Sequence, residues 1–309
     1  MAILYSKADF DIAAPHAPAG LSNVRQYFFK YMCASTAKKV LRNNTLRWSK
    51  PELLNDPFDM QIDLGIETDY IKIIDEITEA VWENYTSGNP ASGVSRIMAK
   101  FQSFSYETQK QLLRSTMAER LPEQQFAKMP GLINDANLRS REKFKHVKML
   151  SLTVDPFVPT MWSHYADSHK GVVLRIKNNS EKSILPHCTP VRYRKKIPYM
   201  FATRLYVDKL FETDSFDPRD IFYNSLYVKS DHWSYEDEWR IVFPGRAPTQ
   251  SFEDIPLHYE EIDGIIFGLR TSKSDIEEIL EIVGSRRISL MQTTRQMDTF
   301  DIGITDYDH

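Results

Sequence analysis

Residues Tyr235–Ile241, with the sequence YEDEWRI, carry the clearest strand pattern of this chain. Successive side chains of an extended strand point to opposite faces, so Trp239 is predicted to face the core. Glu236, Glu238 and Arg240 then share the other face. A guanidinium next to a carboxylate favours the charged form of that carboxylate. The segment therefore predicts a strand that is anchored on one face and carries two carboxylates on the other.

Outward from this segment, further strand patterns lie towards both ends of the chain. They are predicted at residues 24–31, 45–49, 148–153, 171–176, 264–268 and 287–292, and the strand of the opening segment is predicted to run over 238–243. Between about 66 and 146, apolar side chains recur at helical spacing instead. Strands on both sides of a helical region predict an α+β fold, with one domain over residues 24–309 that holds a helical insertion at about 66–146.

Two local patterns refine this outline. Residues 1–23 contain Pro15, Pro18 and Gly20 and are predicted to be a flexible N-terminal segment. A helix before the last strand is predicted to have Ser274 in its capping box and Gly284 at its end.

Charge and cysteine content restrict the classes of protein that fit. The formal net charge is −3, from 39 Lys and Arg and 42 Asp and Glu, so there is no general attraction for nucleic acid or an anionic membrane. Cys33 and Cys188 lie far apart, which disfavours a disulfide framework, and no metal site is expected. No signal peptide and no apolar stretch of roughly 20 residues occurs, so a cytoplasmic protein without membrane contact is expected. A local basic patch or a solvated edge strand is predicted from Arg192, Arg194, Lys195, Lys196 and Arg204.

Four short motifs follow one another along the chain. They are Leu46–Ser49 leading to Asn55–Asp59 (NDPFD), Met161–Val172 (MWSHYADSHKGV), Trp233–Ile241 (WSYEDEWRI) and Ile265–Gly268 (IIFG). In this order and spacing they resemble a bacterial family of domains of unknown function with NDPF, WSHYA…HKG and WxYExEWR signatures. The resemblance covers roughly residues 24–295.

That family in turn is distantly similar to the ADP-ribosyltransferases, which bind NAD in a split sheet. The resemblance implies a split, mostly antiparallel mixed sheet, with NAD as the substrate. It places Lys30 or Tyr31 on the first strand of the site and Ser49 on the second. It places Glu238 or Glu236 on a later strand. By this resemblance, Tyr31 packs on nicotinamide and Ser49 contacts the nicotinamide ribose.

The two glutamates suit this chemistry for a physical reason. Breaking the glycosidic bond of NAD passes through an oxocarbenium-like transition state, which a fixed carboxylate stabilises. Glu238 is the expected catalytic residue, Glu236 is the second candidate, and Arg240 beside them is a candidate for binding NAD. The alternative interpretation is a row of ion pairs on a strand face.

Two other motifs supply further candidates. Asn55 and Asp56 form either a rigid Asx turn or a loop that lines the ligand pocket with both side chains. His164 can titrate near neutral pH and act as a general acid or base, and Tyr165 can stack on a flat ring. The alternative for the second motif is a helix start in which Ser163 is the cap and the aromatic side chains pack inward.

The sequence thus favours an ADP-ribosyltransferase-like enzyme that uses NAD, in the role of an intracellular toxin or antiviral effector. Its acceptor would be a protein, a nucleic acid or water, and an antitoxin or other regulatory protein is a possible partner. Two alternatives stay open: a non-catalytic domain that senses a nucleotide or a phage component, and a metal-dependent nuclease. NAD turnover with and without a chelator would separate the three.

Overall fold

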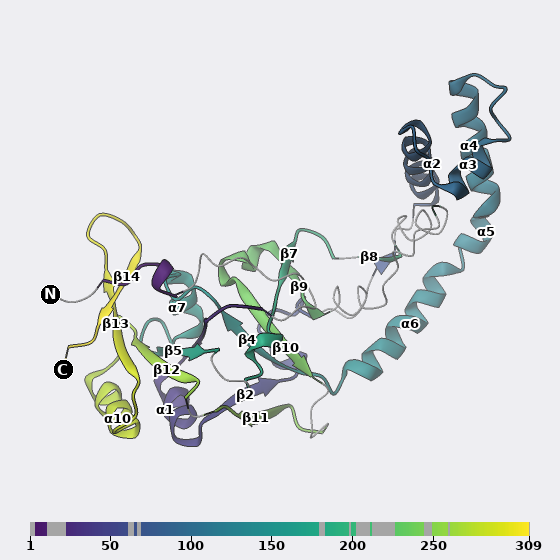
Figure 1. Cartoon of the computed structure of the whole chain (residues 1–309). Helices are drawn as coiled ribbons and strands as arrows, with labels where there is room; N and C mark the ends of the chain where they lie inside the picture. Colours follow the sequence, from purple (N-terminus) through teal and green to yellow (C-terminus); the bar gives the residue numbers. More distant parts are fainter. Residues whose placement is uncertain are drawn as a thin grey trace. The chain divides into compact units, whose positions relative to one another are not determined.

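The computed structural model describes residues 4–10, 23–60, 65–66, 69–178, 183–197, 199–201, 211, 226–243, 249–258 and 260–308 (Figure 1). The chain forms two compact units. The sheet unit comprises residues 1–59, 145–195 and 227–309, and the helical unit comprises residues 60–144 and 196–226. The helices predicted at about 66–146 lie in the helical unit, which also takes in residues 196–226.

A mixed, mostly antiparallel sheet organises the sheet unit and confirms the α+β class. Within the described residues its strands run in the order β11-β2-β4-β1-β5-β12-β13-β14, and β10 and β6 join it through β4. Only β12 and β13 are parallel neighbours there, and helix α10 (Lys273–Val283) forms the crossover that parallel strands require. The strands are β1 (Tyr27–Met32), β2 (Thr45–Ser49), β4 (Lys148–Thr153), β5 (Val172–Lys177), β6 (Thr189–Pro190), β10 (Glu238–Phe243), β11 (Phe252–Pro256), β12 (Ile262–Phe267), β13 (Ser289–Arg295) and β14 (Ile302–Asp306).

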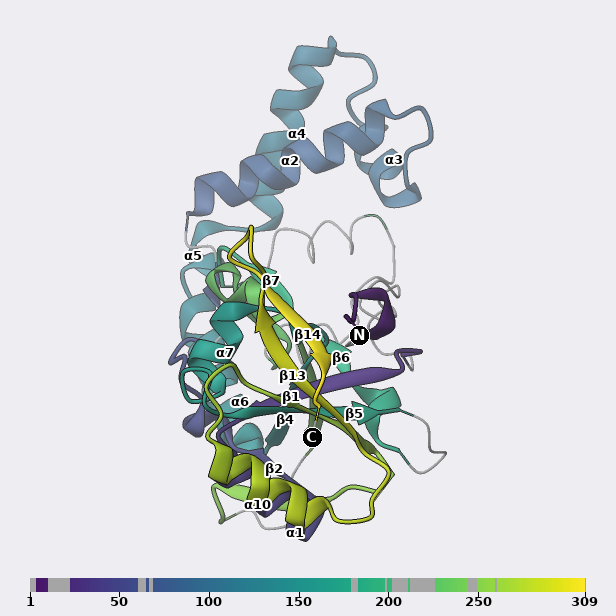
Figure 2. The same cartoon turned by 90° about the vertical axis from the view of Figure 1, so that its left-hand side faces the viewer.

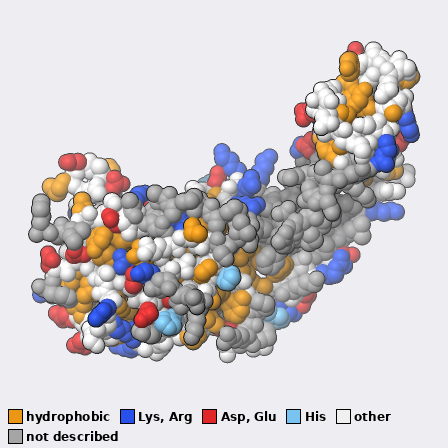
Figure 3. Space-filling view, in the orientation of Figure 1, with side chains coloured by type: hydrophobic (Ala, Val, Ile, Leu, Met, Phe, Trp, Pro, Cys, Tyr) orange, Lys and Arg blue, Asp and Glu red, His pale blue; other side chains and the backbone are white. Residues whose placement is uncertain are grey.

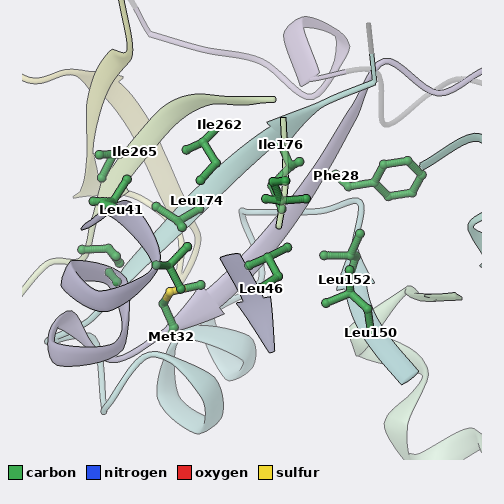
Figure 4. Close-up of a cluster of buried hydrophobic side chains, with 14 of the residues drawn as sticks. Phe28, Met32, Leu41, Leu46, Leu150, Leu152, Leu174, Ile176, Ile262 and Ile265 are labelled. Atoms are coloured by element: carbon green, nitrogen blue, oxygen red, sulfur yellow. The ribbon is translucent and has the colours of Figure 1, made fainter. Parts of the chain in front are cut away.

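Apolar clusters cover both faces of this sheet. Neighbouring side chains of β1 point to opposite faces, so Phe28 joins one cluster and Phe29 the other. Helices α1 (Ala34–Asn43) and α10 contribute to the first cluster and lie next to each other in both views (Figures 1 and 2). Helix α7 (Pro159–Tyr165) and Phe10 contribute to the second. Figure 4 shows part of the first cluster, where side chains from the sheet meet those of α1.

Residues 4–10 pack onto the sheet, whereas the sequence predicts a flexible segment over 1–23. Leu4 forms a bridge with Thr305, and the Tyr5 hydroxyl donates to the Asp306 carboxylate at 2.6 Å. Phe10 is fully buried. The apolar side chains of this stretch therefore complete the core, and residues 1–3 and 11–22 of the predicted segment lie outside the described residues.

The end of α10 confirms one sequence prediction, and its start corrects another. Gly284 is the C-cap with φ 54°, as expected. The N-cap is Ser272 instead of Ser274, because the Ser272 hydroxyl accepts the N–H of Asp275 at 3.1 Å. The helix therefore begins two residues earlier than the predicted capping box.

The helical unit has its own apolar core. Asp69 caps its first long helix by accepting the N–H of Lys72, and Ser105 caps another by accepting the N–H of Thr108. No helix of the described residues is long and apolar enough to span a membrane. The elements of this unit are β3 (Gly65–Ile66), α2 (Tyr70–Thr86), α3 (Ser92–Met98), α4 (Tyr106–Arg120), α5 (Glu123–Phe126), α6 (Met129–Phe144) and β8 (Tyr199–Phe201), which pairs with β3.

A left-handed turn connects α7 to β5. Asp167, Ser168 and His169 have φ values of 47°, 54° and 69°, which non-glycine residues adopt rarely. Gly171 follows without a positive φ, and its role is close packing: a Cβ there would lie 2.2 Å from the Met32 carbonyl oxygen. This turn brings the WSHYA motif against the end of β1.

Candidate functional site

Glu236 and Glu238 enter the site from two different elements. The 3-10 helix η4 (Asp231–Glu236) ends at Glu236, Asp237 takes a left-handed conformation with φ 39°, and β10 begins at Glu238. The strand predicted over Glu238–Phe243 is therefore confirmed, whereas residues 235–237 are not extended as the alternating pattern indicates. The Thr153 hydroxyl donates to the Glu236 carbonyl at 2.6 Å and fixes the end of η4. The two carboxylates consequently approach each other across a turn.

Arg240 lies at the centre of a buried ion network. Its Nε donates to Glu238 Oε1 at 2.7 Å, and its Nη2 donates to Glu238 Oε2 at 2.8 Å. The same Nη2 donates to Asp59 Oδ2 at 2.6 Å. The guanidinium has no exposed surface, although the sequence predicts it on the face away from the core. Two-point contact of this kind holds a carboxylate in one orientation.

Lys229 joins the network from β9 (Val228–Ser230). Its Nζ donates to Glu236 Oε2 at 2.6 Å and to Glu238 Oε2 at 3.2 Å, and it lies 3.4 Å from Asp59 Oδ2. We call Asp59, Lys229, Glu236, Glu238 and Arg240 the ion network. Its members are all buried, and its three carboxylates share two cations.

The two glutamates have opposite pKa shifts. Burial alone would raise the pKa of Glu238, but Arg240 and Lys229 outweigh burial and hold this pKa at about 2. Burial also raises the pKa of Glu236, and Lys229 and Tyr165 offset this only in part. Glu238 is thus firmly ionised, whereas Glu236 is the carboxyl group whose protonation state changes more easily.

A cavity of about 250 Å³ opens beside the ion network. It lies where β1 and β4 diverge, since these strands share one register pair, Phe29 with Thr153. By contrast, β10 pairs with β4 over its whole length. The cavity is lined by Phe29, Lys30, Tyr31, Leu53, Leu54, Asn55, Asp59, Ser151, Leu152, Thr153, Met161, Tyr165, Lys229, Glu236 and Glu238.

The cavity brings together most of the site residues predicted from the sequence. Those that line it are Lys30, Tyr31, Asn55, Tyr165, Glu236 and Glu238. Those that do not are Ser49, Asp56, His164 and Arg240.

Ser49 lies at the end of β2, where it pairs with Met149 of β4 and Phe252 of β11. Ser49 therefore does not line the cavity, and its contact with a ribose stays a prediction from the resemblance. The serine in the cavity is Ser151, two residues further along β4, whose side chain hydrogen-bonds Glu238.

The NDPFD loop divides its side chains between two roles. Asp56 Oδ1 accepts the N–H of Phe58 at 2.9 Å, which is the Asx turn expected from the sequence. The side chain of Asp56 is buried in this turn and does not reach the cavity. Asn55 lines the cavity, and its Nδ2 donates to the Tyr165 hydroxyl at 3.0 Å.

Tyr165 connects this loop to the ion network. Its hydroxyl donates to Glu236 Oε1 at 2.5 Å. Burial and this bond raise the pKa of Tyr165, so the phenol stays protonated and remains a donor. Among the described residues, Tyr165 thus donates to Oε1 of Glu236 and Lys229 donates to Oε2.

Lys30 and Tyr31 form the β1 side of the cavity. The Tyr31 hydroxyl donates to the Asp155 carbonyl at 3.0 Å, and its ring meets Trp162 edge-on. Lys30 Nζ donates to the Ser151 carbonyl at 2.6 Å. Burial lowers the pKa of Lys30, although Glu238 and Glu236 oppose this shift. Both side chains are therefore fixed in place before any ligand binds.

His164 lies outside the cavity, on the exposed end of α7. Its Nδ1 is 2.9 Å from the Tyr235 hydroxyl. A general acid or base must lie within hydrogen-bond reach of the reacting group, and His164 does not line the cavity. The catalytic role of His164 stays a prediction from the sequence, because the hydrogen bonds of a general acid or base often tighten only when substrate is bound. Ser163 is not the helix cap, since Val158 precedes the first turn of α7.

Sequence reasoning missed Lys229 and Ser151, and it considered Asp59 only as one of the carboxylates of the alternative nuclease site. Asp59 is the last residue of the NDPFD motif, so its position was marked. Lys229 has no such pattern, because it reaches the network through the pairing of β9 with β7 (Arg192–Arg194). No group of three His, Cys, Asp or Glu side chains within the described ranges is arranged to hold a metal ion.

A family model described as a protein of unknown function (DUF2971) matches residues 161–241 of the chain. The matched range runs from α7 to β10 and includes Tyr165, Lys229, Glu236 and Glu238. No curated protein and no solved structure matches the chain. The similarity therefore covers the part of the sequence that supplies most charged groups of the site.

Proposed function

We propose that the cavity binds the nicotinamide ribosyl part of NAD and that the protein is an ADP-ribosyltransferase-like enzyme. The observation that carries the proposal is that Tyr31, Tyr165, Glu236 and Glu238 line one cavity where β1 and β4 diverge. This arrangement resembles the split sheet in which ADP-ribosyltransferases bind NAD.

The size of the cavity supports binding of part of the dinucleotide. Small-molecule pockets typically enclose about 300–1,000 Å³. A cavity of about 250 Å³ has room for a nicotinamide ring and part of its ribose, with the rest of NAD outside. The tyrosines supply flat apolar surface, and Asn55 supplies an amide for the polar groups of the ligand.

We assign the catalytic role to Glu236 in preference to Glu238. Arg240 and Lys229 occupy both oxygens of Glu238 and neutralise its charge. Tyr165 donates to one oxygen of Glu236 and Lys229 to the other, and each oxygen keeps acceptor capacity, because an ionised carboxylate oxygen can accept two hydrogen bonds. Glu236 can therefore accept a bond from a ribose hydroxyl and stabilise positive charge on the sugar.

In the proposed reaction the bond between C1′ of the ribose and the nicotinamide nitrogen breaks. Its electron pair leaves with nicotinamide, which becomes neutral. A lone pair of the acceptor forms the new bond to C1′, and the acceptor loses a proton. The fixed carboxylate of Glu236 lowers the barrier because it does not need to reorganise as the cation develops. We further propose that the protein acts in the cytoplasm as a toxin or defence effector restrained by a regulatory protein.

The direct test is release of nicotinamide from NAD by the purified full chain, measured by chromatography with and without a chelator. We expect release that is insensitive to the chelator. Release that requires a divalent metal, or NAD-independent cleavage of nucleic acid, would contradict the proposal and favour the nuclease.

A second candidate is a non-catalytic nucleotide-sensing domain. It is favoured by the close pairing of Glu238, Arg240 and Asp59, which is typical of a structural network. Binding of NAD measured by calorimetry, without any nicotinamide release over a long incubation, would support this candidate over the enzyme.

A further inference from the structure

An exposed aromatic surface lies next to the cavity and has no role in the proposed glycosidic cleavage. We call His164, Trp233 and Tyr235 the aromatic shelf. The ring centroids lie 6.4 Å apart for His164 and Trp233, 5.9 Å for His164 and Tyr235, and 6.0 Å for Trp233 and Tyr235. His164 is exposed and the other two rings are half-buried. The ring planes are inclined to one another by 64°, 63° and 41° in the same order, so a flat ligand can stack on one ring of the shelf at a time.

The aromatic shelf is continuous with the cavity. The ring of His164 lies 6.2 Å from that of Tyr165, which lines the cavity and bonds Glu236. The ring of Trp233 lies 5.0 Å from Lys229 Nζ, the same atom that bonds Glu236. A flat ring bound on the shelf would therefore lie beside the carboxylate assigned to the reaction.

Positive charge lies along the neighbouring strand. Strand β7 contacts η4, the element that carries Trp233 and Tyr235. Arg192 and Arg194 of β7 are exposed, whereas Tyr193 between them points inward and accepts the N–H of Glu238 at 2.8 Å. Figure 3 shows Lys and Arg side chains gathered near the position of β7 in Figure 1. The charge is local, because the chain as a whole has a net charge of −3.

We propose that the aromatic shelf and the exposed arginines of β7 bind single-stranded nucleic acid, with one base stacked on the shelf. Aromatic side chains beside a basic strand are the combination that single strands require, since stacking holds the bases and cations hold the phosphates. A duplex keeps its bases stacked inside and cannot use the shelf. This binding needs no NAD; the idea that the bound base accepts ADP-ribose rests on the proposed function.

As an acceptor, the base would donate a nitrogen or oxygen lone pair to C1′ as nicotinamide departs with its electron pair, and the base would lose one proton to water at the exposed shelf. This step requires no oxidant, reductant or metal. It would resolve the open choice of acceptor in favour of nucleic acid.

The experiment measures fluorescence anisotropy of a labelled single strand of about 12 nucleotides, as DNA and as RNA, with the full chain and no NAD. We expect binding that weakens with salt and exceeds binding of the matching duplex. Trp233→Ala should weaken binding roughly fivefold to a hundredfold, because one base loses its stacking partner. Phe300→Ala, at a fully exposed site on the β13–β14 hairpin, is the matched control.

A second variant tests the phosphate contacts. Arg194→Ala should reduce the slope of log affinity against log salt by about 0.7, and exposed Arg295→Ala should not. No binding of a single strand at low salt, stronger binding of duplex, or equal losses in the controls would overturn the inference. Because the binding experiment contains no NAD, a negative result there would not contradict the proposed release of nicotinamide. Conversely, a protein that releases no nicotinamide could still bind the single strand.

Discussion

Glu238 on β10 and Glu236 at the end of η4 are separated by a single residue, yet they occupy different environments. Glu238 faces Arg240 and Lys229 inside the wall of the sheet, and its pKa is lowered to about 2. Glu236 also lines the cavity and contacts Lys229, but its second donor is the neutral hydroxyl of Tyr165, and its pKa is raised. The left-handed residue Asp237 between them makes this difference possible. This difference is the reason why we propose Glu236, and not Glu238, as the catalytic residue.

The largest expected effect comes from removing the shared cation. Arg240→Gln leaves Glu238 and Asp59 buried without their guanidinium, and breaking a buried pair in this way costs about 3–5 kcal/mol. Urea unfolding should show this loss. Arg47→Gln, which breaks an exposed pair with Asp254, should cost below about 1 kcal/mol. Equal losses of unfolding free energy in the two variants would contradict the structural role given to Glu238 and Arg240.

The second largest effect is expected on the rate of nicotinamide release when Glu236 is replaced. Glu236→Gln keeps the size of the side chain but removes the charge that would stabilise the sugar cation. We expect nicotinamide release to fall about a hundred- to a thousandfold, with a smaller loss of stability than in Arg240→Gln. Exposed Glu281→Gln on α10 is the control. A greater loss per folded molecule in Glu238→Gln would reverse the assignment of the two glutamates.

The two glutamates should change the free energy of unfolding in opposite directions as the pH falls. The pKa of Glu238 falls from 4.5 to about 2 on folding, so its contribution is present above pH 4.5 and is lost as the pH falls towards 2. This shift corresponds to about 3 kcal/mol. The pKa of Glu236 is raised, so its contribution has the opposite sign and is lost as the pH rises through that pKa. The stability gap between the wild type and Glu238→Gln should therefore narrow on acidification, measured by urea unfolding from pH 6 to pH 3.

The smallest effect should come from the tyrosine beside Glu236. Tyr165→Phe removes the bond to Oε1, and we expect kcat/KM to fall about tenfold. Because that bond lowers the pKa of Glu236, the acid limb of the pH profile should move to higher pH. Tyr5→Phe removes a similar bond to Asp306 and should leave the profile in place. An unshifted acid limb in Tyr165→Phe would show that Glu236 does not control it.

The sequence predicted elements with strong local patterns and missed features set by distant contacts. Apolar runs in β1, β5 and β12 follow from burial on both faces, so their positions could be read directly. The register of β2 on β4 could not, because it depends on long-range pairing, and this is why Ser49 was placed where Ser151 lies. The turn at Asp237 interrupts an alternating pattern without a glycine to mark it.

In the candidate site, too, residues within sequence motifs could be predicted, and residues placed by distant contacts could not. Motif residues such as Asn55, Tyr165 and Glu236 are next to one another in the cavity, as residues chosen for their chemistry should be. Lys229 has no distinguishing neighbour in the sequence, yet it contacts three carboxylates. A lone lysine acquires such a role only through the fold around it.

The ion network also lies close to two of the four covalent crossings between the two units. Asp59 is the last residue of the sheet unit before the chain enters the helical unit at Met60. The chain returns after Leu226, and Lys229 follows within three residues. Tension on the chain at Met60 would thus reach the carboxylate of Asp59 across one peptide bond. Tension at Leu226 would reach the ammonium group of Lys229 across three. The helical unit is mechanically tethered to the charges that surround Glu236 and Glu238.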